Sequence, residues 1–287
     1  FWVGHELESF LEKPLETVAT KAKSVELIDA HGLAKLGFRE GGAFEKHSHD
    51  HEHHDGKEEA DHDHDHEHEK SAKDDHDHDH EKAEADHDHE KGAKDDHDHD
   101  HEKAEADHDH HHHGEFDAHV WLDPMNAKAM VHEIVEALVA ADPANAAKYE
   151  ANAKKVSARL DALVAEVSVD LKPAKGKGFI VFHDAYQYFE NRFGVTAAGS
   201  ITVSPEVIPG AERVREIHAK VKDLGAACVF AEPQFEPKLV STVTEGTAAR
   251  SAVLDPLGAD LQDGPDLYFG LIRNLATSMR DCLGGNS

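Results

Sequence analysis

Two stretches after residue 122 carry apolar side chains at the spacing of an amphipathic helix. The first starts at Asp123-Pro124, a helix start with proline at its first position, and its apolar stripe runs to Val139. The second follows Asp142-Pro143 and ends before Pro173. Its roughly 29 residues would span about 43 Å at 1.5 Å per residue. This pattern predicts a long helix that links two domains.

Short apolar runs alternate with predicted helices along the rest of the chain. Strands are predicted at residues 179–182, 228–231 and 252–254, with helices at 211–224 and 265–282 between and after them. Nearer the start, strands are predicted at 1–3, 25–28 and 119–122 and a helix at 7–22. Strands that alternate with helices indicate a mostly parallel sheet, so the predicted fold class is α/β. The predicted domains are an N-terminal α/β lobe (1–141), a long linker helix (142–172) and a C-terminal α/β lobe (173–287).

Residues 45–113 interrupt the first lobe with a segment of low complexity. It contains 28 Asp or Glu, 8 Lys and 22 of the 28 histidines of the chain, and residues 73–89 recur unchanged at 94–110. Alanine is the only apolar residue of this repeat, so a packed core is not expected. We predict a disordered insertion. Its interleaved imidazoles and carboxylates favour metal capture over the alternative of a solvated spacer, because a spacer needs no histidine.

The charge of the chain excludes several classes of protein. With 59 acidic and 30 basic residues, its net charge of −29 opposes binding to nucleic acid. No apolar run approaches the roughly 20 residues of a membrane span, and no signal region precedes the first helix. The chain also has no Gly-x-Ser-x-Gly, His-Glu-x-x-His or phosphate-binding glycine loop, so no enzyme is predicted.

Polar residues that follow apolar runs are candidates for a binding site, because ligands bind beyond the carboxyl ends of parallel strands. His119, His183, Glu232 and Asp255 occupy such positions. Two imidazoles and a carboxylate from separate strand ends would suit zinc. Each also has a structural alternative. Either histidine could be a hydrogen-bonded structural residue, and Asp255 could open a turn before Pro256. Glu232 is more typical of a structural carboxylate or of one at the mouth of a cleft.

Other titratable residues gave weaker signals. Asp184 beside His183 is similar to the His-Asp pair of metal phosphohydrolases, an alternative that we regard as minor because those pairs lie on helices. His5, His31, His132 and His218 have no supporting context and are interpreted as surface residues. Cys228 and Cys282 are too few for a disulfide scaffold and could form one disulfide in an oxidising compartment.

Taken together, the motifs resemble the zinc-specific periplasmic solute-binding proteins of bacterial ABC transporters, the cluster A-I metal-binding family. They are Trp-Val-Gly-x-Glu-Leu-Glu-x-Phe-Leu near the start, the His-rich insertion, Asp-Ala-His-Val-Trp-Leu-Asp-Pro, Phe-His-Asp-Ala-Tyr, Ala-Glu-Pro-Gln-Phe and Leu-Asp-Pro-Leu-Gly. The resemblance covers nearly the whole chain outside the insertion. It implies two α/β lobes with mostly parallel sheets, joined by one long rigid helix, with metal bound in the cleft between them.

The resemblance also implies a ligand set and partners. His119 and His183 would bind Zn²⁺, Asp255 would be a nearby or weak ligand, and Cys228 and Cys282 would form a disulfide. The expected partner is the membrane permease of an ABC transporter, with a periplasmic zinc chaperone as a second candidate. The protein is expected to be a periplasmic monomer. A further ligand histidine is expected in a segment before Phe1.

The predicted function is therefore high-affinity Zn²⁺ capture and delivery to a permease, with the His-rich loop concentrating or sensing zinc. Two alternative functions stay open at this point. A zinc store or buffer would bind several ions with similar affinity. A zinc hydrolase would use His119, His183 and Asp255 with an open water position.

Overall fold

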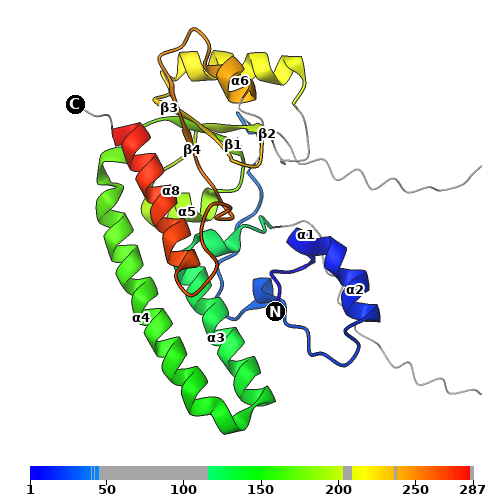
Figure 1. The fold of residues 1–287 in the computed structure, drawn as a ribbon. Coiled ribbons are helices and arrows are strands. Elements are labelled where there is room, and N and C mark those ends of the chain that lie inside the picture. Colours follow the sequence, from blue (N-terminus) through cyan, green and yellow to red (C-terminus); the bar gives the residue numbers. More distant parts are fainter. Residues whose placement is uncertain (40, 42, 45–115, 203–208, 236–237, 285–287) are drawn as a thin grey trace, which may run out of the picture. The chain divides into compact units, whose positions relative to one another are not determined.

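The computed structural model describes residues 1–39, 41, 43–44, 116–202, 209–235 and 238–284. The predicted insertion at 45–113 lies outside these residues. The described part is a mixed α/β structure with a four-stranded sheet and long helices (Figure 1), which confirms the predicted fold class. No helix among the described residues is long and apolar enough to cross a membrane.

The sheet is built from β1 (Phe179–His183), β2 (Gly199–Thr202), β3 (Cys228–Ala231) and β4 (Arg250–Val253). Its order is β2-β1-β3-β4 and every neighbouring pair is parallel. The predicted strands at 179–182, 228–231 and 252–254 are thereby confirmed. β2 was not predicted, because its four residues, Gly-Ser-Ile-Thr, contain one strongly apolar side chain.

Alternate residues of β1 pack on opposite faces of the sheet, as the two-residue period of a strand requires. Phe179 and Val181 belong to a core that includes residues of the helices α4 (Ala146–Asp170), α5 (Gln187–Phe193) and α8 (Leu267–Gly284). Ile180 and Phe182 belong to a second core, with residues of α6 (Ala211–Asp223) and α7 (Lys238–Thr244). Both faces are covered by helices (Figure 1), so β1 is buried along its whole length.

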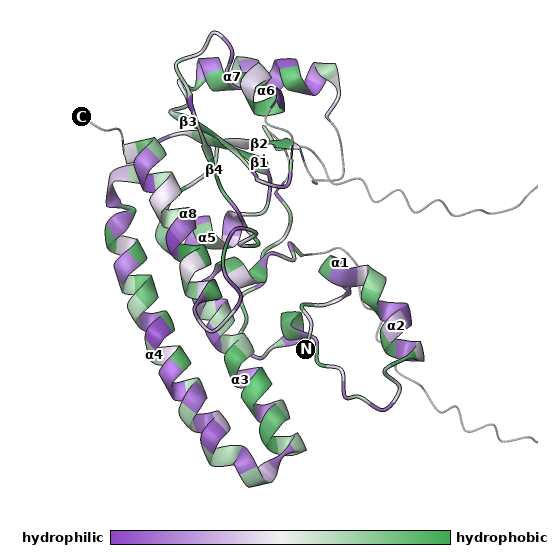
Figure 2. Cartoon of the chain, viewed as in Figure 1, coloured by the Kyte–Doolittle hydropathy of each residue, from purple (hydrophilic) through white to green (hydrophobic). Residues whose placement is uncertain are grey.

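The two long helices agree with their sequence signals. α3 (Pro124–Ala141) is capped by the preceding Asp123, whose side chain accepts a hydrogen bond from the backbone N–H of Met125. α4 has 25 residues and follows a short 3₁₀ turn, η4 (Pro143–Asn145). Polar and apolar residues alternate along α4 (Figure 2), and Leu160, Leu163 and Val167 form its buried face. The division into two lobes and a linker stays a prediction.

The beginning of the chain is less regular than predicted. The expected helix at 7–22 is divided into α1 (His5–Glu8), η1 (Ser9–Leu11) and α2 (Glu12–Thr17). The expected strands at 1–3 and 25–28 are not regular strands: Trp2 and Glu26 form an isolated parallel bridge, and Ile28 donates a backbone hydrogen bond to Val3 beside it. The chain then turns into η2 (Leu27–Asp29).

The predicted strand at 119–122 is also wrong. Val120–Leu122 form a 3₁₀ turn, η3. Asp117 accepts the backbone N–H of His119, and Asn126 donates its side-chain amide to the carbonyl of Val120. These side-chain bonds satisfy backbone groups that a strand would pair with a neighbouring strand, so the apolar run curls into the start of α3.

Candidate metal centre

His183 is the last residue of β1, where the carboxyl ends of the parallel strands lie. Its side chain is 5% exposed, and its Nδ1 lies 2.7 Å from Oε1 of Glu232, the residue that follows β3. A carboxylate only accepts hydrogen bonds, so Nδ1 donates to it, and in the neutral ring Nε2 keeps the lone pair. The sheet thus fixes both the position and the tautomer of His183.

His119 reaches the same place from the turn before η3. Its Nδ1 lies 2.6 Å from Oδ1 of Asp117, which is 1% exposed. The second oxygen of Asp117 accepts a hydrogen bond from the side-chain amide of Gln187 at 2.7 Å. By the same argument Nδ1 of His119 donates to Asp117, and in the neutral ring its Nε2 also keeps a lone pair.

The two imidazoles meet through their Nε2 atoms, 3.3 Å apart. In a tetrahedral zinc site with Zn–N bonds of about 2.0–2.1 Å, two ligand nitrogens lie about 3.3–3.4 Å apart. The separation in the structure therefore equals one edge of such a tetrahedron. Each imidazole is held by a carboxylate on its other nitrogen, the arrangement that orients histidine ligands of metals.

The surroundings of the pair connect three parts of the chain. Trp121 donates its indole N–H to the carbonyl of Pro256 at 3.0 Å, and Tyr268 donates to the carbonyl of Trp121 at 2.8 Å. η3 is thereby joined to the loop after β4 and to α8. Tyr186, completely buried, donates to the carbonyl of Leu254. Burial, followed by the nearby carboxylates of Glu232 and Asp255, raises the pKa of Tyr186 well above its usual value.

Asp255 is engaged in local bonds. Its carboxylate accepts hydrogen bonds from the backbone N–H groups of Leu257, Gly258 and Ala259 and from the side chain of Gln234. It opens the turn at Pro256, as the structural alternative predicted. Among the described residues, one group of three His, Cys, Asp or Glu residues has its ligand atoms within 4.8 Å of one another, and Asp255 is not a member. Its role as a ligand stays a prediction.

Glu232 and Asp117 are the site residues that sequence reasoning undervalued. Glu232 was interpreted as a structural or mouth-of-cleft carboxylate, whereas in the structure it accepts a hydrogen bond from Nδ1 of His183. Asp117 was not singled out, although Asp-Ala-His places a carboxylate two residues before a candidate ligand. That spacing allows an aspartate to hydrogen-bond both the backbone and the ring of the histidine, and it was the available signal.

Asp184 is paired with an arginine, which argues against the hydrolase-type interpretation of the His183-Asp184 pair. Arg39 contacts Asp184 and Glu190 with its guanidinium group, and both carboxylates are 4% exposed. Burial lowers the pKa of Arg39, but its bonds to the two carboxylates outweigh this and leave the pKa raised. Burial raises the pKa of Glu190, and the bonds from Arg39 offset only part of that rise.

The disulfide implied by the resemblance is present. Cys228 on β3 and Cys282 on α8 are bonded, with a Cα–Cα distance of 6.1 Å. It links the sheet to the last helix.

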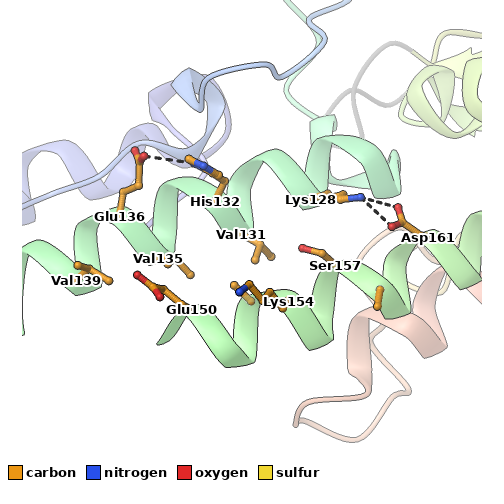
Figure 3. Close-up of a pocket in the computed structure, with 12 residues that line it drawn as sticks. Lys128, Val131, His132, Val135, Glu136, Val139, Glu150, Lys154, Ser157 and Asp161 are labelled. Atoms are coloured by element: carbon orange, nitrogen blue, oxygen red, sulfur yellow. Dashed lines mark hydrogen bonds and ion pairs between the residues drawn. The ribbon is translucent and has the colours of Figure 1, made fainter. Parts of the chain in front are cut away.

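Of the four histidines interpreted as surface residues, His132 is 72% exposed and lies near Glu136 on α3. It lines a groove between α3 and α4 (Figure 3), together with Lys128, Val131, Val135, Lys154 and Asp161. None of the residues that line this groove belongs to the histidine pair. His5, in contrast, is 16% exposed and lies against two glutamates, so the surface interpretation was wrong for it.

The fold and the paired imidazoles define a metal-binding protein of the solute-binding class. The chain belongs to the family described as zinc-uptake complex component A, periplasmic, whose model matches residues 1–282. This membership confirms the predicted family, a role in zinc uptake and Zn²⁺ as the bound ion. Proteins of this family are transport components, so the prediction that the chain is not an enzyme is also confirmed.

The comparisons with individual proteins agree. The chain is 59% identical over 283 residues to the high-affinity zinc uptake system protein ZnuA of Brucella abortus (strain 2308), covering 99% of this chain and 76% of the relative. It is 42% identical to the protein of the same name from Yersinia pestis over 60% of this chain and 54% of the relative.

Solved structures give the same result over part of the chain. A crystal structure of ZnuA matches with a TM-score of 0.53 and 28% identity, covering 59% of this chain and 61% of that one. A mutant of the laminin-binding adhesin Lmb of Streptococcus agalactiae also matches, with a TM-score of 0.53 and 28% identity over 58% of this chain and 63% of that one. The chain therefore spans less than two thirds of the length of these solved structures.

Proposed function

We propose that His119 and His183 bind the Zn²⁺ ion that this protein takes up. The observation that carries the proposal is the 3.3 Å separation of their Nε2 atoms, which equals a ligand–ligand edge of tetrahedral zinc. Both Nδ1 atoms are hydrogen-bonded to carboxylates, so in the neutral rings both Nε2 atoms present a lone pair to an ion. The ion would replace an imidazole–imidazole contact with two coordinate bonds.

The carboxylates behind the imidazoles support the same proposal. Asp117 and Glu232 are buried and place two negative charges on the far side of the ligand rings. Their hydrogen bonds increase the basicity of Nε2 and fix the orientation of each ring. A divalent cation at Nε2 compensates these charges, which makes the unusual burial of both groups understandable.

Asp255 is proposed as an additional, weaker ligand. Tetrahedral zinc takes at least three protein ligands, and Asp255 lies close enough to influence Tyr186 beside the pair. Since its oxygens accept three backbone N–H groups, coordination would require one of these bonds to be given up.

The His-rich segment at 45–113 is proposed to concentrate or sense zinc around the tight site. Its composition supports this, because 22 largely neutral imidazoles at pH 7 offer many transient ligand sets. Zinc storage is the second candidate function. A store would fill many sites of similar affinity, whereas a receptor has one tight site and several weak ones.

Delivery of zinc to the membrane permease of an ABC transporter, in the periplasm, is the proposed physiological step. The family description names a component of a zinc-uptake complex and a periplasmic location. A monomer is proposed, and a periplasmic zinc chaperone is a further proposed partner. A pull-down of the permease with metal-loaded and metal-free protein tests the first of these partners.

The ligand assignment is tested with the full chain in competition with a strong zinc chelator, so that weak sites stay empty. We expect His183→Ala and His119→Ala each to weaken the tight site at least about 100-fold, because each removes a coordinate bond. His132→Ala is the matched control, since it removes an exposed imidazole from α3. Equal affinity in His183→Ala and wild type would refute the assignment.

The separate roles of the histidine pair and the His-rich segment are tested by deleting residues 47–113. We expect the weak sites to disappear and one tight site to remain. Loss of the tight site after deletion would show that the segment supplies a ligand to the pair. Many sites of similar affinity in the full chain, with no tight site among them, would favour the storage function.

A further inference from the structure

His5, Glu6 and Glu26 form a cluster near the beginning of the chain that the zinc-uptake site does not use. Nε2 of His5 lies 3.3 Å from Oε1 of Glu6, and Nδ1 of His5 lies 3.6 Å from Oε2 of Glu26. Among the described residues, this is the group of three metal-ligating side chains whose ligand atoms lie within 4.8 Å of one another. The side chains are 16%, 15% and 36% exposed, so the cluster opens to solvent on the Glu26 side.

Local backbone structure brings the three side chains together. Glu8 accepts hydrogen bonds from the backbone N–H groups of Val3 and Gly4, which fixes the turn before His5. The bridge between Trp2 and Glu26 then places Glu26 beside this turn. Since Trp2 also exchanges backbone hydrogen bonds with Val25 and Leu27, the position of Glu26 is set on both sides.

Gly4 leaves a space that faces both carboxylates. A Cβ atom at Gly4 would lie 3.1 Å from Oε2 of Glu6 and 3.4 Å from Oε2 of Glu26, and 2.9 Å from a methyl group of Ile28. Gly4 has φ +147°, which disfavours any residue with a side chain. The glycine therefore allows two carboxylate oxygens to approach the same point beside the backbone.

One of these oxygens lacks a partner. Oε2 of Glu6 is buried and has no hydrogen bond among the described residues. A buried, unsatisfied carboxylate oxygen next to a second carboxylate is costly, because both desolvation and like-charge repulsion oppose it. A cation at this point would remove both costs.

We propose that His5, Glu6 and Glu26 form a second binding site for a divalent transition-metal ion. One imidazole nitrogen and two carboxylate oxygens give a three-ligand set, and water would complete the coordination of zinc or a similar ion. The two carboxylates neutralise the charge of the ion. The site lies in a different chain segment from His119 and His183, so it stands independently of the proposed uptake site.

The alternative is that a protonated His5 forms an ion pair with the two glutamates in the same arrangement. It needs no metal and would leave the cluster insensitive to metal ions at neutral pH. The chain contains two tryptophans that separate these outcomes. Trp2 adjoins the cluster through its bridge to Glu26, and the ring of Trp121 lies 5.3 Å from that of His119.

The experiment uses the full chain labelled with ¹⁵N-tryptophan, titrated with Co²⁺ at neutral pH. Co²⁺ occupies zinc-type nitrogen and oxygen sites, and its unpaired electrons perturb nearby nuclei even without a conformational change. We expect the Trp121 signals to respond at the uptake site and the Trp2 signals to respond in a separate saturable step. In His5→Gln the Trp2 step should weaken by about tenfold or more, with the Trp121 step unchanged.

His31→Gln is the matched control, because it removes an exposed imidazole from the same chain segment. If His5→Gln alters the Trp2 signals before metal is added, Glu26→Gln supplies the same test from the more exposed ligand. A Trp2 signal that does not respond to Co²⁺ up to millimolar concentration would overturn the proposal, as would an equal response in the wild type and both ligand variants. If the Trp121 signals alone do not respond to Co²⁺, this result would count against the proposed uptake site and not against the second site.

Discussion

The two imidazoles of the proposed uptake site come from regions that are built differently. His183 ends a buried strand of a four-stranded sheet, and apolar cores cover both faces of that sheet. His119 precedes a 3₁₀ turn, and side chains of Asp117, Gln187 and Tyr188 hold the segment around it. Apolar packing therefore positions one ligand and polar bonds position the other. We expect the polar region to respond more strongly to single substitutions of charged or hydrogen-bonding residues.

Arg39→Leu is expected to have the largest effect. It leaves the buried carboxylates of Asp184 and Glu190 without their shared cation, which should lower the free energy of unfolding by about 3–5 kcal/mol. Chemical denaturation measures this loss. Lys35→Leu is the control, because Lys35 pairs with the exposed Asp29 and should change stability by less than about 1 kcal/mol. Equal effects of the two substitutions would show that the buried network contributes no special stability.

Removing the disulfide tests the apolar region. Cys228 and Cys282 are 54 residues apart, and the chain-entropy estimate for a loop of this length is about 4 kcal/mol. We expect Cys228→Ser with Cys282→Ser to lower the free energy of unfolding by up to about this amount while the tight zinc site is retained, since the core around β1 remains. Reduction of the wild type followed by denaturation should give a similar loss. A large loss of zinc affinity in the folded double variant would show that the disulfide supports the zinc site as well as the stability of the fold.

Asp117→Asn and Glu232→Gln compare the two carboxylates that orient the imidazoles. Each substitution keeps the size and one acceptor oxygen but removes the negative charge and the second acceptor, so zinc affinity should fall about 10–100-fold. Asp117→Asn should be the stronger of the two, because the sheet still positions His183 when Glu232 is changed. Chelator competition provides the measurement. A stronger effect of Glu232→Gln would reverse our view of which ligand depends on polar bonds.

Tyr188→Phe should have the smallest effect of the four. The hydroxyl of Tyr188 donates to the carbonyl of Asp117 and accepts the backbone N–H of Leu36, so its loss should cost about 1–2 kcal/mol of stability. Burial raises the pKa of Tyr188 to about 12. Because the unfolded chain releases this proton near pH 10, wild-type stability should fall as pH rises from 10 to 12. The fall should be smaller in Tyr188→Phe. Denaturation at pH 8 and pH 11 tests both points.

The same contrast explains how much of the molecule the sequence could predict. The apolar runs at 179–182 and 228–231 became β1 and β3, because burial on both faces leaves a continuous hydrophobic signal. The helix start at Asp123-Pro124 was correct because capping is local chemistry. The strand predicted at 119–122 was wrong, because a hydrogen bond from Asn126 and a carboxylate at Asp117 curl that run. Propensity alone does not contain such contacts.

The candidate site was predictable to a similar degree. His119 and His183 could be nominated from their positions after apolar runs, and the structure brings their Nε2 atoms together. The network of Arg39 with Asp184 and Glu190 could not be predicted, since it joins residues about 150 positions apart through side chains alone. The cluster at His5 was missed for a different reason, because it depends on a backbone turn at Gly4 and a bridge to Glu26 that the hydrophobic pattern does not show.

His119 and His183 are 64 residues apart in the chain, so an ion held between them would act as a removable cross-link. Unfolding would then have to release the metal, and mass action would add about 2.7 kcal/mol to stability at a free zinc concentration 100 times the dissociation constant. The melting temperature would report zinc availability directly. Depletion of zinc would expose the chain to proteolysis, and resupply would protect it, with no change in any covalent bond.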